Sequence, residues 1–418
     1  MTILASPLTD RNVRPARTGA RRSVVAEWFA HPRADTYLVL VPALLLLALG
    51  LMMVLSASSV YAFTHNNGDA YYYVKRQAVF LALGGVLAFV ASRMSNRVLM
   101  VMAWVGLAGV LVLQLLTFTP LGVGVNGNRN WVQLGTDLFR IQPGEFAKLA
   151  IVLWGADVFA RKDRLLDQTK HLLVPFLPVC VVLMCLIIVQ RDLGTGMLLG
   201  AIVVAMLWVA GARWRVLASL FAVVAVTILT LVATSANRLG RIIGFLNPDA
   251  DPLGTNHQPI RAMFALASGG WWGLGLGASR QKWGGLVEAH TDYVLAVIGE
   301  ELGLVGVLIV LALFLTMGFA GFRIAMRQTS NFSRYAAAGV TAWLMIEALV
   351  NILVVLRLLP VIGLPLPFLS YGGSAMVANL LGVGVLVACA RQEPGAKTVR
   401  RRHARPGVTA VVDAGRSA

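Results

Sequence analysis

The chain has 418 residues, of which 58% are hydrophobic and only 13% are charged, and its mean hydropathy is +0.75. Soluble domains carry about 25% charged residues, so this composition excludes a water-soluble fold and predicts a polytopic membrane protein. A net charge of +17 would suggest nucleic-acid binding in a soluble chain. Here arginine and lysine gather in loops and tails that set membrane topology, so we expect contact with the membrane and no nucleic-acid partner.

Ten segments reach or approach the roughly 20 apolar residues needed to cross a bilayer. They are residues 37–62, 77–92, 98–118, 143–160, 172–190, 194–211, 216–236, 293–320, 335–356 and 371–390. We therefore expect an all-α polytopic membrane protein with about ten transmembrane helices in one membrane domain, 37–391. Residues 1–36 and 392–418 are rich in Arg, Ala, Gly and Pro without hydrophobic periodicity, which predicts disordered basic tails.

The distribution of positive charge predicts the orientation in the membrane. About two thirds of the 36 Lys and Arg residues lie in the tails and in short loops that share one side. Both termini are therefore expected in the cytoplasm. Two large loops, about 119–142 and 237–292, then face outward. The second, between spans 7 and 8, is too long for a simple connector and is expected to be functional or partly helical. Its segment 268–278 is rich in glycine and tryptophan and suits a membrane surface.

The stretch 288–303 carries the most informative polar residues of the chain. It reads Glu-Ala-His-Thr-Asp-Tyr-Val-Leu-Ala-Val-Ile-Gly-Glu-Glu-Leu-Gly and begins at the outer mouth of the eighth span. Carboxylates are costly in a bilayer and usually have a function there, so Asp292 is the first catalytic candidate. Its alternative role is to cap the following helix. His290 is either an interfacial hydrogen-bonding residue or part of the same site.

Helical periodicity makes a further prediction for the eighth span. On one continuous helix, three glycines lie within about 40° of the direction of Asp292 and leave a groove beneath its carboxylate. Glu300 flanks that face and is a candidate substrate contact, while Glu301 points away from it. The three glycines are Gly299, Gly303 and Gly306.

Further candidates lie in the two outer loops and at the start of the fourth span. Glu145 and Lys148 are three residues apart and share a helix face. They form either a structural ion pair, with Lys148 extending to the interface, or a charged pair that lines a polar cavity. Arg129 is a candidate phosphate ligand because its planar guanidinium suits a diphosphate. Trp131 is an interfacial anchor or a substrate platform, and Arg261 is another candidate cation.

The segment 359–374 reads Leu-Pro-Val-Ile-Gly-Leu-Pro-Leu-Pro-Phe-Leu-Ser-Tyr-Gly-Gly-Ser. Its three prolines and repeated glycines exclude a continuous helix. At membrane depth, irregular backbone is tolerated only when it is buried in protein or lines a cavity. Ser370, Gly372 and Gly373 are therefore candidate substrate contacts.

Three motifs together resemble the SEDS family, the polytopic peptidoglycan polymerases that include septal FtsW and elongation RodA. They are Gln142-Pro-Gly-Glu-Phe-Ala-Lys148, Glu288-Ala-His-Thr-Asp-Tyr293 with Ile298-Gly-Glu-Glu-Leu-Gly303, and Pro365-Leu-Pro-Phe-Leu-Ser-Tyr-Gly-Gly-Ser374. The resemblance covers about residues 35–392. Residues 149–162 and the sequence Ala390-Arg-Gln-Glu-Pro394 are more similar to actinobacterial FtsW than to RodA.

The chain also departs from the usual residues of this family. Arg191 and Val287 stand where the family usually has proline, and Arg357 stands near a position where it typically has glycine. A glutamine is typical near Glu347. These differences suggest a divergent paralogue, and they leave septal, elongation and sporulation roles open.

The resemblance implies glycosyl transfer from lipid II, an undecaprenyl-diphosphate-linked disaccharide peptide, onto another lipid-linked chain at the outer membrane face. The catalytic aspartate of the family corresponds to Asp292, and its acid–lysine pair corresponds to Glu145 and Lys148. A divalent cation, Mg²⁺ or Mn²⁺, is a candidate cofactor, with Asp292 as a candidate ligand. The expected substrate contacts are Arg129, Trp131, Glu145, Lys148, Arg261, His290, Glu300, Ser370, Gly372 and Gly373.

The resemblance also implies partners and leaves alternatives. The expected partners are a class B penicillin-binding protein that acts as transpeptidase and other divisome proteins. The alternative functions are a lipid II flippase, a non-catalytic scaffold for the transpeptidase, and a RodA-like polymerase that serves cell shape. We expect the protein in the bacterial plasma membrane, at the division septum if the role is septal.

Overall fold

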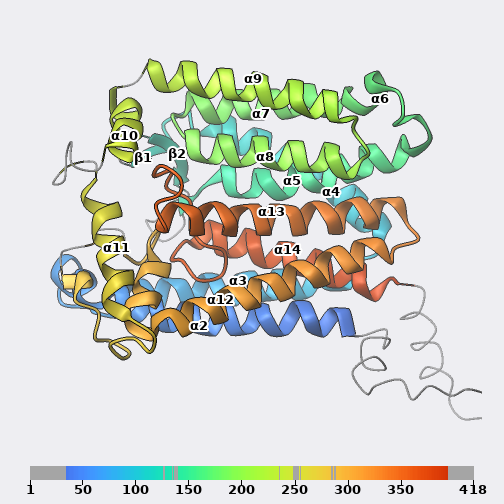
Figure 1. The fold of residues 1–418 in the computed structure, drawn as a ribbon. Helices are drawn as coiled ribbons and strands as arrows, with labels where there is room; N and C mark the ends of the chain where they lie inside the picture. Colours follow the sequence, from blue (N-terminus) through green and yellow to red (C-terminus); the bar gives the residue numbers. More distant parts are fainter. Residues whose placement is uncertain are drawn as a thin grey trace, which may run out of the picture.

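The computed structural model describes residues 34–125, 128–133, 135, 140–234, 236–247, 254, 256–283, 286 and 289–393. The predicted tails lie almost wholly outside these residues, as do Val287 and Glu288. The described chain forms a bundle of long helices that run side by side, with short elements at both ends (Figure 1). The prediction of a helical polytopic fold is confirmed.

Ten helices among the described residues run along the bundle (Figure 1). They are α2 (Ala34–His65), α3 (Tyr72–Arg93), α4 (Asn96–Leu116), α5 (Pro143–Arg161), α7 (Phe176–Val189), α8 (Leu193–Val209), α9 (Trp214–Ala233), α12 (Val294–Met326), α13 (Asn331–Val355) and α14 (Gly373–Arg391). Their bounds lie close to the predicted spans, and the largest difference is that α12 continues to Met326.

Eight stretches of the described residues are long and apolar enough to cross a membrane, with α7 counted together with the short α6 (Thr169–Leu173). The two remaining long helices are α8, which is apolar but has only 17 residues, and α5, which carries charged residues inside its 19. Both lie within the bundle beside the other eight (Figure 1). Ten membrane crossings therefore stay a prediction, and eight are supported by length and composition alone.

The bundle has two different ends (Figure 1). We call one the tail end, because α2 begins and α14 ends there, and α6 lies at the same end of the bundle (Figure 1). We call the other the sheet end, because it holds a small sheet together with α10 (Ala236–Leu246) and α11 (His257–Gly269). The strands β1 (Gly122–Val125), β2 (Asn128–Gln133) and β3 (Arg140–Ile141) pair antiparallel in the order β1-β2-β3.

The two predicted outer loops contain these sheet-end elements. The sheet corrects the all-α expectation for 119–142, and side chains along β2 alternate between more and less buried, as they do in a strand with one covered face. Helices α10 and α11 lie in 237–292, which agrees with the expectation of a partly helical loop.

Helices α13 and α14 form the centre of the bundle. In the most apolar 18-residue stretch of each helix, 72% and 89% of the residues are buried inside the protein, against 6% in α9. Because α9 lies at the edge of the bundle (Figure 1), its exposed apolar side chains are expected to face lipid. Small residues let α14 approach α3 closely, since a side chain at Gly384 would overlap the backbone of Ala88.

Helix α12 is broken near its first third. Gly303 has φ 70° and ψ −169°, a backbone conformation that glycine adopts most readily. The loop 270–275 takes over the hydrogen bonds that the break releases. The bonds join Leu304 N–H to Gly270 C=O (2.9 Å), Val305 N–H to Trp271 C=O (3.2 Å), Leu274 N–H to Glu300 C=O (2.9 Å) and Gly275 N–H to Glu301 C=O (3.0 Å).

This break shows that the predicted glycine groove under Asp292 is wrong. The position of Gly299 faces Leu266 of α11, and Gly303 packs against the backbone of the inserted loop. The prediction assumed one continuous helix, whereas the glycines allow another part of the chain to pack closely against α12.

Two helices end on an arginine whose backbone is left-handed. Arg191 follows α7 with φ 68°, and Arg357 follows α13 with φ 57°. In both places two backbone N–H groups donate to carbonyls of the last helical turns. At the end of α7, Arg191 N–H donates to Ile188 C=O (2.9 Å) and Asp192 N–H to Ile187 C=O (3.2 Å). At the end of α13, Arg357 N–H donates to Val354 C=O (3.0 Å) and Leu358 N–H to Leu353 C=O (2.7 Å). This conformation costs a non-glycine residue roughly 1–2 kcal/mol, which is why glycine is the usual residue there.

Candidate functional site

Asp292 lies at the sheet end, just before α12. Its side chain is half-buried, while the next nine residues are buried. The N-cap of α12 is Tyr293, which makes no side-chain capping bond, so Asp292 precedes the cap position that was its alternative role. Burial and the charge of Asp292 raise the pKa of the Tyr293 phenol, and the charge of Arg241 opposes this rise. Both charges therefore act on the same buried phenol.

A buried amide holds the backbone that carries Asp292. Asn351 of α13 is 2% exposed, and its Nδ2 donates to the carbonyls of Asp292 at 2.9 Å and Leu364 at 2.7 Å. Gly363 lies beside the carboxylate, since a side chain there would come within 3.4 Å of Oδ2. The start of α12 and the irregular segment after α13 are thus joined at one side chain, which sequence reasoning did not single out.

His290 is packed among three tyrosines next to Asp292. Its ring centre lies 4.8 Å from that of Tyr73, 5.7 Å from Tyr371 and 5.8 Å from Tyr61. Its backbone carbonyl accepts the N–H of Tyr371 at 2.8 Å. Burial raises the pKa of Tyr371 to about 12, so this phenol stays protonated at neutral pH. The cluster joins α2, α3 and the segment before α14 at the site of Asp292.

The candidate residues of the proline-rich segment help to hold its shape. Ser370 Oγ accepts the N–H of Leu366 at 2.8 Å. Gln77 of α3 is fully buried, and it donates to the carbonyl of Ser370 at 3.2 Å and accepts from the N–H of Gly372 at 3.3 Å. Gly373 begins α14 directly afterwards. These residues form part of the wall near Asp292, and their contact with a substrate stays a prediction.

Glu145 and Lys148 belong to a buried charged cluster inside the bundle. Lys148 Nζ lies 2.7 Å from Glu145 Oε2 and 2.8 Å from Glu347 Oε1, and none of the three side chains is more than 3% exposed. The indole of Trp343 donates to the other oxygen of Glu347 at 2.6 Å. Lys148 therefore does not extend to the interface. Its second partner was missed, although a carboxylate inside an apolar span is itself a signal.

Three further candidates come from different elements of the sheet end. Arg129 of β2 is exposed, and its Nη2 donates to the carbonyl of Thr119 at 2.8 Å. Trp131 lies half-buried in the same strand. Arg261 of α11 has its Nε 3.5 Å from Nε2 of His257, one helical turn away. Joint contact of these residues with one substrate stays a prediction.

Glu300 is buried and bound to the glycine- and tryptophan-rich loop. Its Oε2 accepts from Ser279 Oγ at 2.5 Å, and its Oε1 accepts from the N–H of Arg280 at 2.9 Å. Glu301 also accepts from Ser279, through the backbone N–H at 3.3 Å, and Lys282 Nζ lies 3.6 Å from it. Both carboxylates therefore hold the same segment, residues 279–282, on α12.

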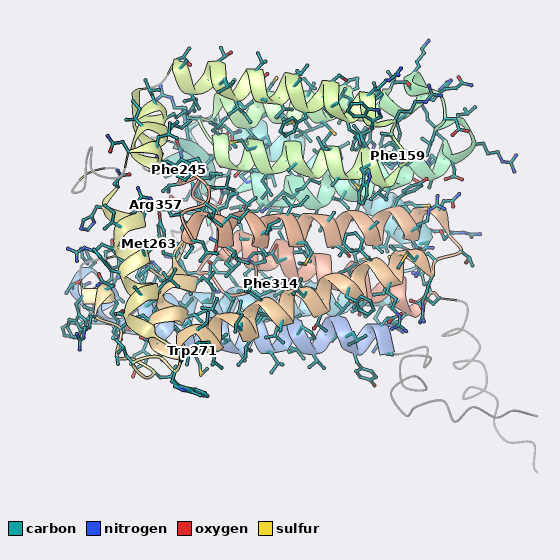
Figure 2. The ribbon with its side chains drawn as sticks, in the orientation of Figure 1. Phe159, Phe245, Met263, Trp271, Phe314 and Arg357 are labelled. Carbon is teal, nitrogen blue, oxygen red and sulfur yellow. The ribbon has the colours of Figure 1, made fainter. Side chains whose placement is uncertain are left out.

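A shallow hollow opens at the sheet end between α10, the start of α11 and the segment that follows α13. Its lining residues are Arg241, Phe245, Asn256, Pro259, Arg357, Leu359, Pro360 and Val361. Arg241 Nη1 donates to the carbonyl of Val361 at 3.5 Å, and Arg357 Nη2 donates to that of Gly244 at 3.3 Å. Figure 2 shows Phe245 and Arg357 at this end of the bundle. The irregular segment that lines the hollow continues to Gly363, which borders Asp292.

A divalent cation would require several oxygen or nitrogen ligands around Asp292. Among the described residues, no group of three or more His, Cys, Asp or Glu side chains could hold a metal ion. Asp292 therefore has no preformed ligand set in that part of the chain, and Glu288 lies outside it.

The fold and this site define a multi-pass helical membrane protein with a carboxylate at one end of the bundle. The family model described as Cell cycle protein, FtsW/RodA/SpoVE, matches residues 36–394. The probable peptidoglycan glycosyltransferase FtsW of Mycobacterium tuberculosis is 38% identical over 381 residues, which cover 91% of this chain and 72% of that protein. Stage V sporulation protein E of Bacillus subtilis is 36% identical, over 85% of this chain and 97% of that protein.

Solved structures of related proteins also match this chain. A chain from "Structural coordination of polymerization and crosslinking by a peptidoglycan synthase complex" matches with a TM-score of 0.68 and 27% identity, over 84% of this chain and 96% of that chain. RodA of Thermus thermophilus matches with a TM-score of 0.61 and 27% identity, over 88% and 99%. The chain belongs to the FtsW/RodA/SpoVE family, which is the SEDS family that its motifs resemble. The similarity to an actinobacterial FtsW is confirmed as well.

Proposed function

We propose that the protein is a peptidoglycan glycosyltransferase that polymerises lipid II into glycan strands. In this reaction a sugar hydroxyl of one lipid-linked glycan forms a bond to the anomeric carbon of another, which releases undecaprenyl diphosphate. Family membership and the function named for its FtsW relatives support the proposal. The same names support a septal role in cell division, with RodA-like elongation as the alternative.

The observation that carries the proposal is the position of Asp292. Its carboxylate lies half-buried beside Gly363, on a backbone that Asn351 holds in place. The attacking hydroxyl must lose a proton as it forms the new bond, and a carboxylate with restricted geometry can accept that proton as a general base. A fixed backbone would keep Oδ2 directed at the same point through each turnover.

The diphosphate leaving group requires cationic stabilisation. Two carboxylates already surround Lys148, so its charge is compensated within the bundle. Arg129 and Arg261 lie instead at the end that carries Asp292, and they are the better candidates for diphosphate contact. A divalent cation bound with the substrate would supply the same stabilisation.

We place the sheet end outside the cytoplasmic membrane and both termini in the cytoplasm. The positive-inside rule counts basic residues in short connections and near the span ends, and the short connections of the tail end support this orientation. The basic residues in or beside these connections are Arg93, Arg97, Arg161, Lys162, Arg164, Lys170, Arg213, Arg215, Arg327 and Arg334. A cysteine introduced as Gly254→Cys should react with an impermeant thiol reagent in intact cells. Protection there, together with labelling of the C-terminal tail, would contradict the orientation.

We propose a class B penicillin-binding protein as the partner, with other divisome proteins. The structural neighbour named for polymerization and crosslinking is a synthase complex, which supports a coupled transpeptidase. The outward faces of α12 and α13 carry exposed Leu304, Leu308, Phe319 and Leu349, which a single transmembrane helix could cover. Co-purification from membranes should recover such a protein. Polymerase activity that is unchanged by adding it would contradict functional coupling.

The substitution Asp292→Asn tests the proposed chemistry. It keeps the size of the side chain and removes its basicity, so polymerisation of purified lipid II should fall by about 10²–10⁴-fold. Thermal unfolding in detergent serves as the control and should be close to wild type. Near-normal glycan synthesis by the folded variant would contradict the role of Asp292. Lipid II translocation without polymerisation by the wild-type protein would favour a flippase, and inactivity in both assays would favour a scaffold.

A further inference from the structure

The hollow at the sheet end combines two guanidinium groups with an apolar wall. Arg241 enters from α10 and Arg357 from the end of α13, while Phe245 and the segment 359–361 supply apolar surface. We propose that Arg241 and Arg357 form a phosphate-binding site in this hollow, which holds the phosphate or diphosphate group of an amphipathic lipid. Arg357 is central to the site because its backbone position does not otherwise call for arginine.

The end of α13 is closed by backbone atoms alone. Arg357 has φ 57°, and the two bonds that end the helix use its N–H and that of Leu358. Glycine adopts this conformation without the steric cost that any larger residue bears. The arginine side chain therefore does not help to end the helix, and strain of this kind is characteristic of functional positions. We therefore attribute the presence of an arginine at position 357 to its guanidinium group, which lines the hollow.

The guanidinium groups of this hollow have donors left for a ligand. Each carries five N–H groups, of which Arg241 uses one on Val361 and Arg357 uses one on Gly244. Among the described residues, neither arginine forms a salt bridge with a carboxylate. Two positive charges on one hollow repel each other, and an anion between them removes that repulsion. The planar fork of N–H groups matches phosphate oxygens in pairs.

The surroundings of the arginines suit a lipid phosphate more than a free ion. The apolar side chains of Phe245, Leu359 and Val361 border the hollow, so a hydrocarbon chain joined to the phosphate has apolar surface to cover. The same segment reaches Gly363 beside Asp292. The inference deepens the proposed function and rests on it for one choice, that of a prenyl diphosphate as the first ligand to test.

Binding can be measured without turnover, which separates this inference from the glycosyl-transfer proposal. The full-length protein in phosphatidylcholine nanodiscs is titrated with farnesyl diphosphate by calorimetry. Arg357→Gly removes the guanidinium and relieves the backbone, so the variant should fold at least as well as wild type. We expect it to bind about 10- to 100-fold more weakly, because charge-assisted hydrogen bonds are lost. Arg357→Lys keeps the charge without the planar fork and should fall between the two.

Arg191→Gly is the matched control. Arg191 ends α7 with φ 68° and the same pair of backbone bonds, but it does not line the hollow. This variant loses the same charge at the same end of the bundle and should bind like wild type. Equal affinity of Arg357→Gly and wild type, or an equal loss in both glycine variants, would overturn the site. So would a wild-type protein that binds no phosphate-bearing probe.

Two competitors identify the source of the phosphate. Displacement of farnesyl diphosphate by inorganic pyrophosphate but not by phosphatidylglycerol supports a prenyl diphosphate as the ligand. Displacement by phosphatidylglycerol supports the same site with a phospholipid headgroup in it. Displacement that is identical in wild type and Arg357→Gly would show that the probe binds elsewhere and would overturn the proposal.

Discussion

Replacement of Lys148 by methionine should strongly destabilise the protein. The ammonium group lies 2.7 Å from Glu145 and 2.8 Å from Glu347, and its side chain is 0% exposed. Without it, two carboxylates remain close together in the interior with no cation between them. Removing one partner from a buried ion pair costs about 3–5 kcal/mol, because the remaining charge cannot return to water. The free energy of unfolding of Lys148→Met should fall by about this amount.

The assay is unfolding of the purified protein in mixed micelles, followed by circular dichroism. Lys75→Met is the matched control, because Lys75 lies 3.0 Å from Asp69 in a pair whose lysine is 68% exposed. Exposed pairs of this kind contribute about 0–1 kcal/mol, so the control should change little. The comparison isolates burial, since both variants remove one lysine from an ion pair.

Combined variants test the same reasoning in the opposite direction. Glu347→Gln keeps the Glu145–Lys148 pair and an acceptor for Trp343, so its cost should be about 1–2 kcal/mol. The triple variant Glu145→Gln, Lys148→Met, Glu347→Gln removes all three charges and should regain most of the stability lost by Lys148→Met alone. A Lys148→Met protein as stable as the Lys75→Met control, or a triple variant less stable than the single one, would refute the argument.

Three other substitutions probe the ends of the bundle. Asn351→Leu should lower the free energy of unfolding by about 2–4 kcal/mol and reduce polymerisation, because two backbone carbonyls lose their buried donor. An unchanged melting temperature would contradict this role of Asn351. Burial and the nearby charge of Asp35 raise the pKa of the Glu393 carboxyl from 4.5 to about 7. Between these two pH values the folded state therefore holds a proton that the unfolded state has released. The free energy of unfolding should fall by about 1–3 kcal/mol as pH rises from about 4.5 to 7. Glu393→Gln should remove that part of the slope, and an identical slope in both proteins would contradict it. Gly303→Ala should destabilise by about 3 kcal/mol or more and expose the loop 270–283 to proteolysis, whereas Gly85→Ala, which adds its methyl to open space, should do neither.

The helical fold could be predicted from the sequence because the bilayer restricts it so strongly. A chain in hydrocarbon must pair its backbone groups within helices, and the thickness of the bilayer sets their length. The predicted span 98–118 and the observed α4 (Asn96–Leu116) differ by two residues at each end for this reason. The small sheet was missed because 119–142 lies outside the apolar segments, where the bilayer imposes no such rule.

The candidate site could be predicted only in part. Asp292 and His290 stand out because polar groups at the mouth of an apolar span are rare, and that signal is local. Asn351 gave no comparable signal, since a single amide near the end of a span has many structural uses. Its role depends on carbonyls 59 and 13 positions away in the chain, which only the packing of α13 brings within reach of one side chain.

The sequence alone determined that this chain is a multi-pass membrane protein of the SEDS type, because composition, segment length and short motifs are local properties. The tertiary structure decided which charges meet. Lys148 and Glu347 are 199 positions apart and form a buried pair only because α5 packs on α13. Likewise, the break at Gly303 has its function only in contact with the loop that fills it. Burial makes such contacts strong, because water cannot replace the missing partner in the interior.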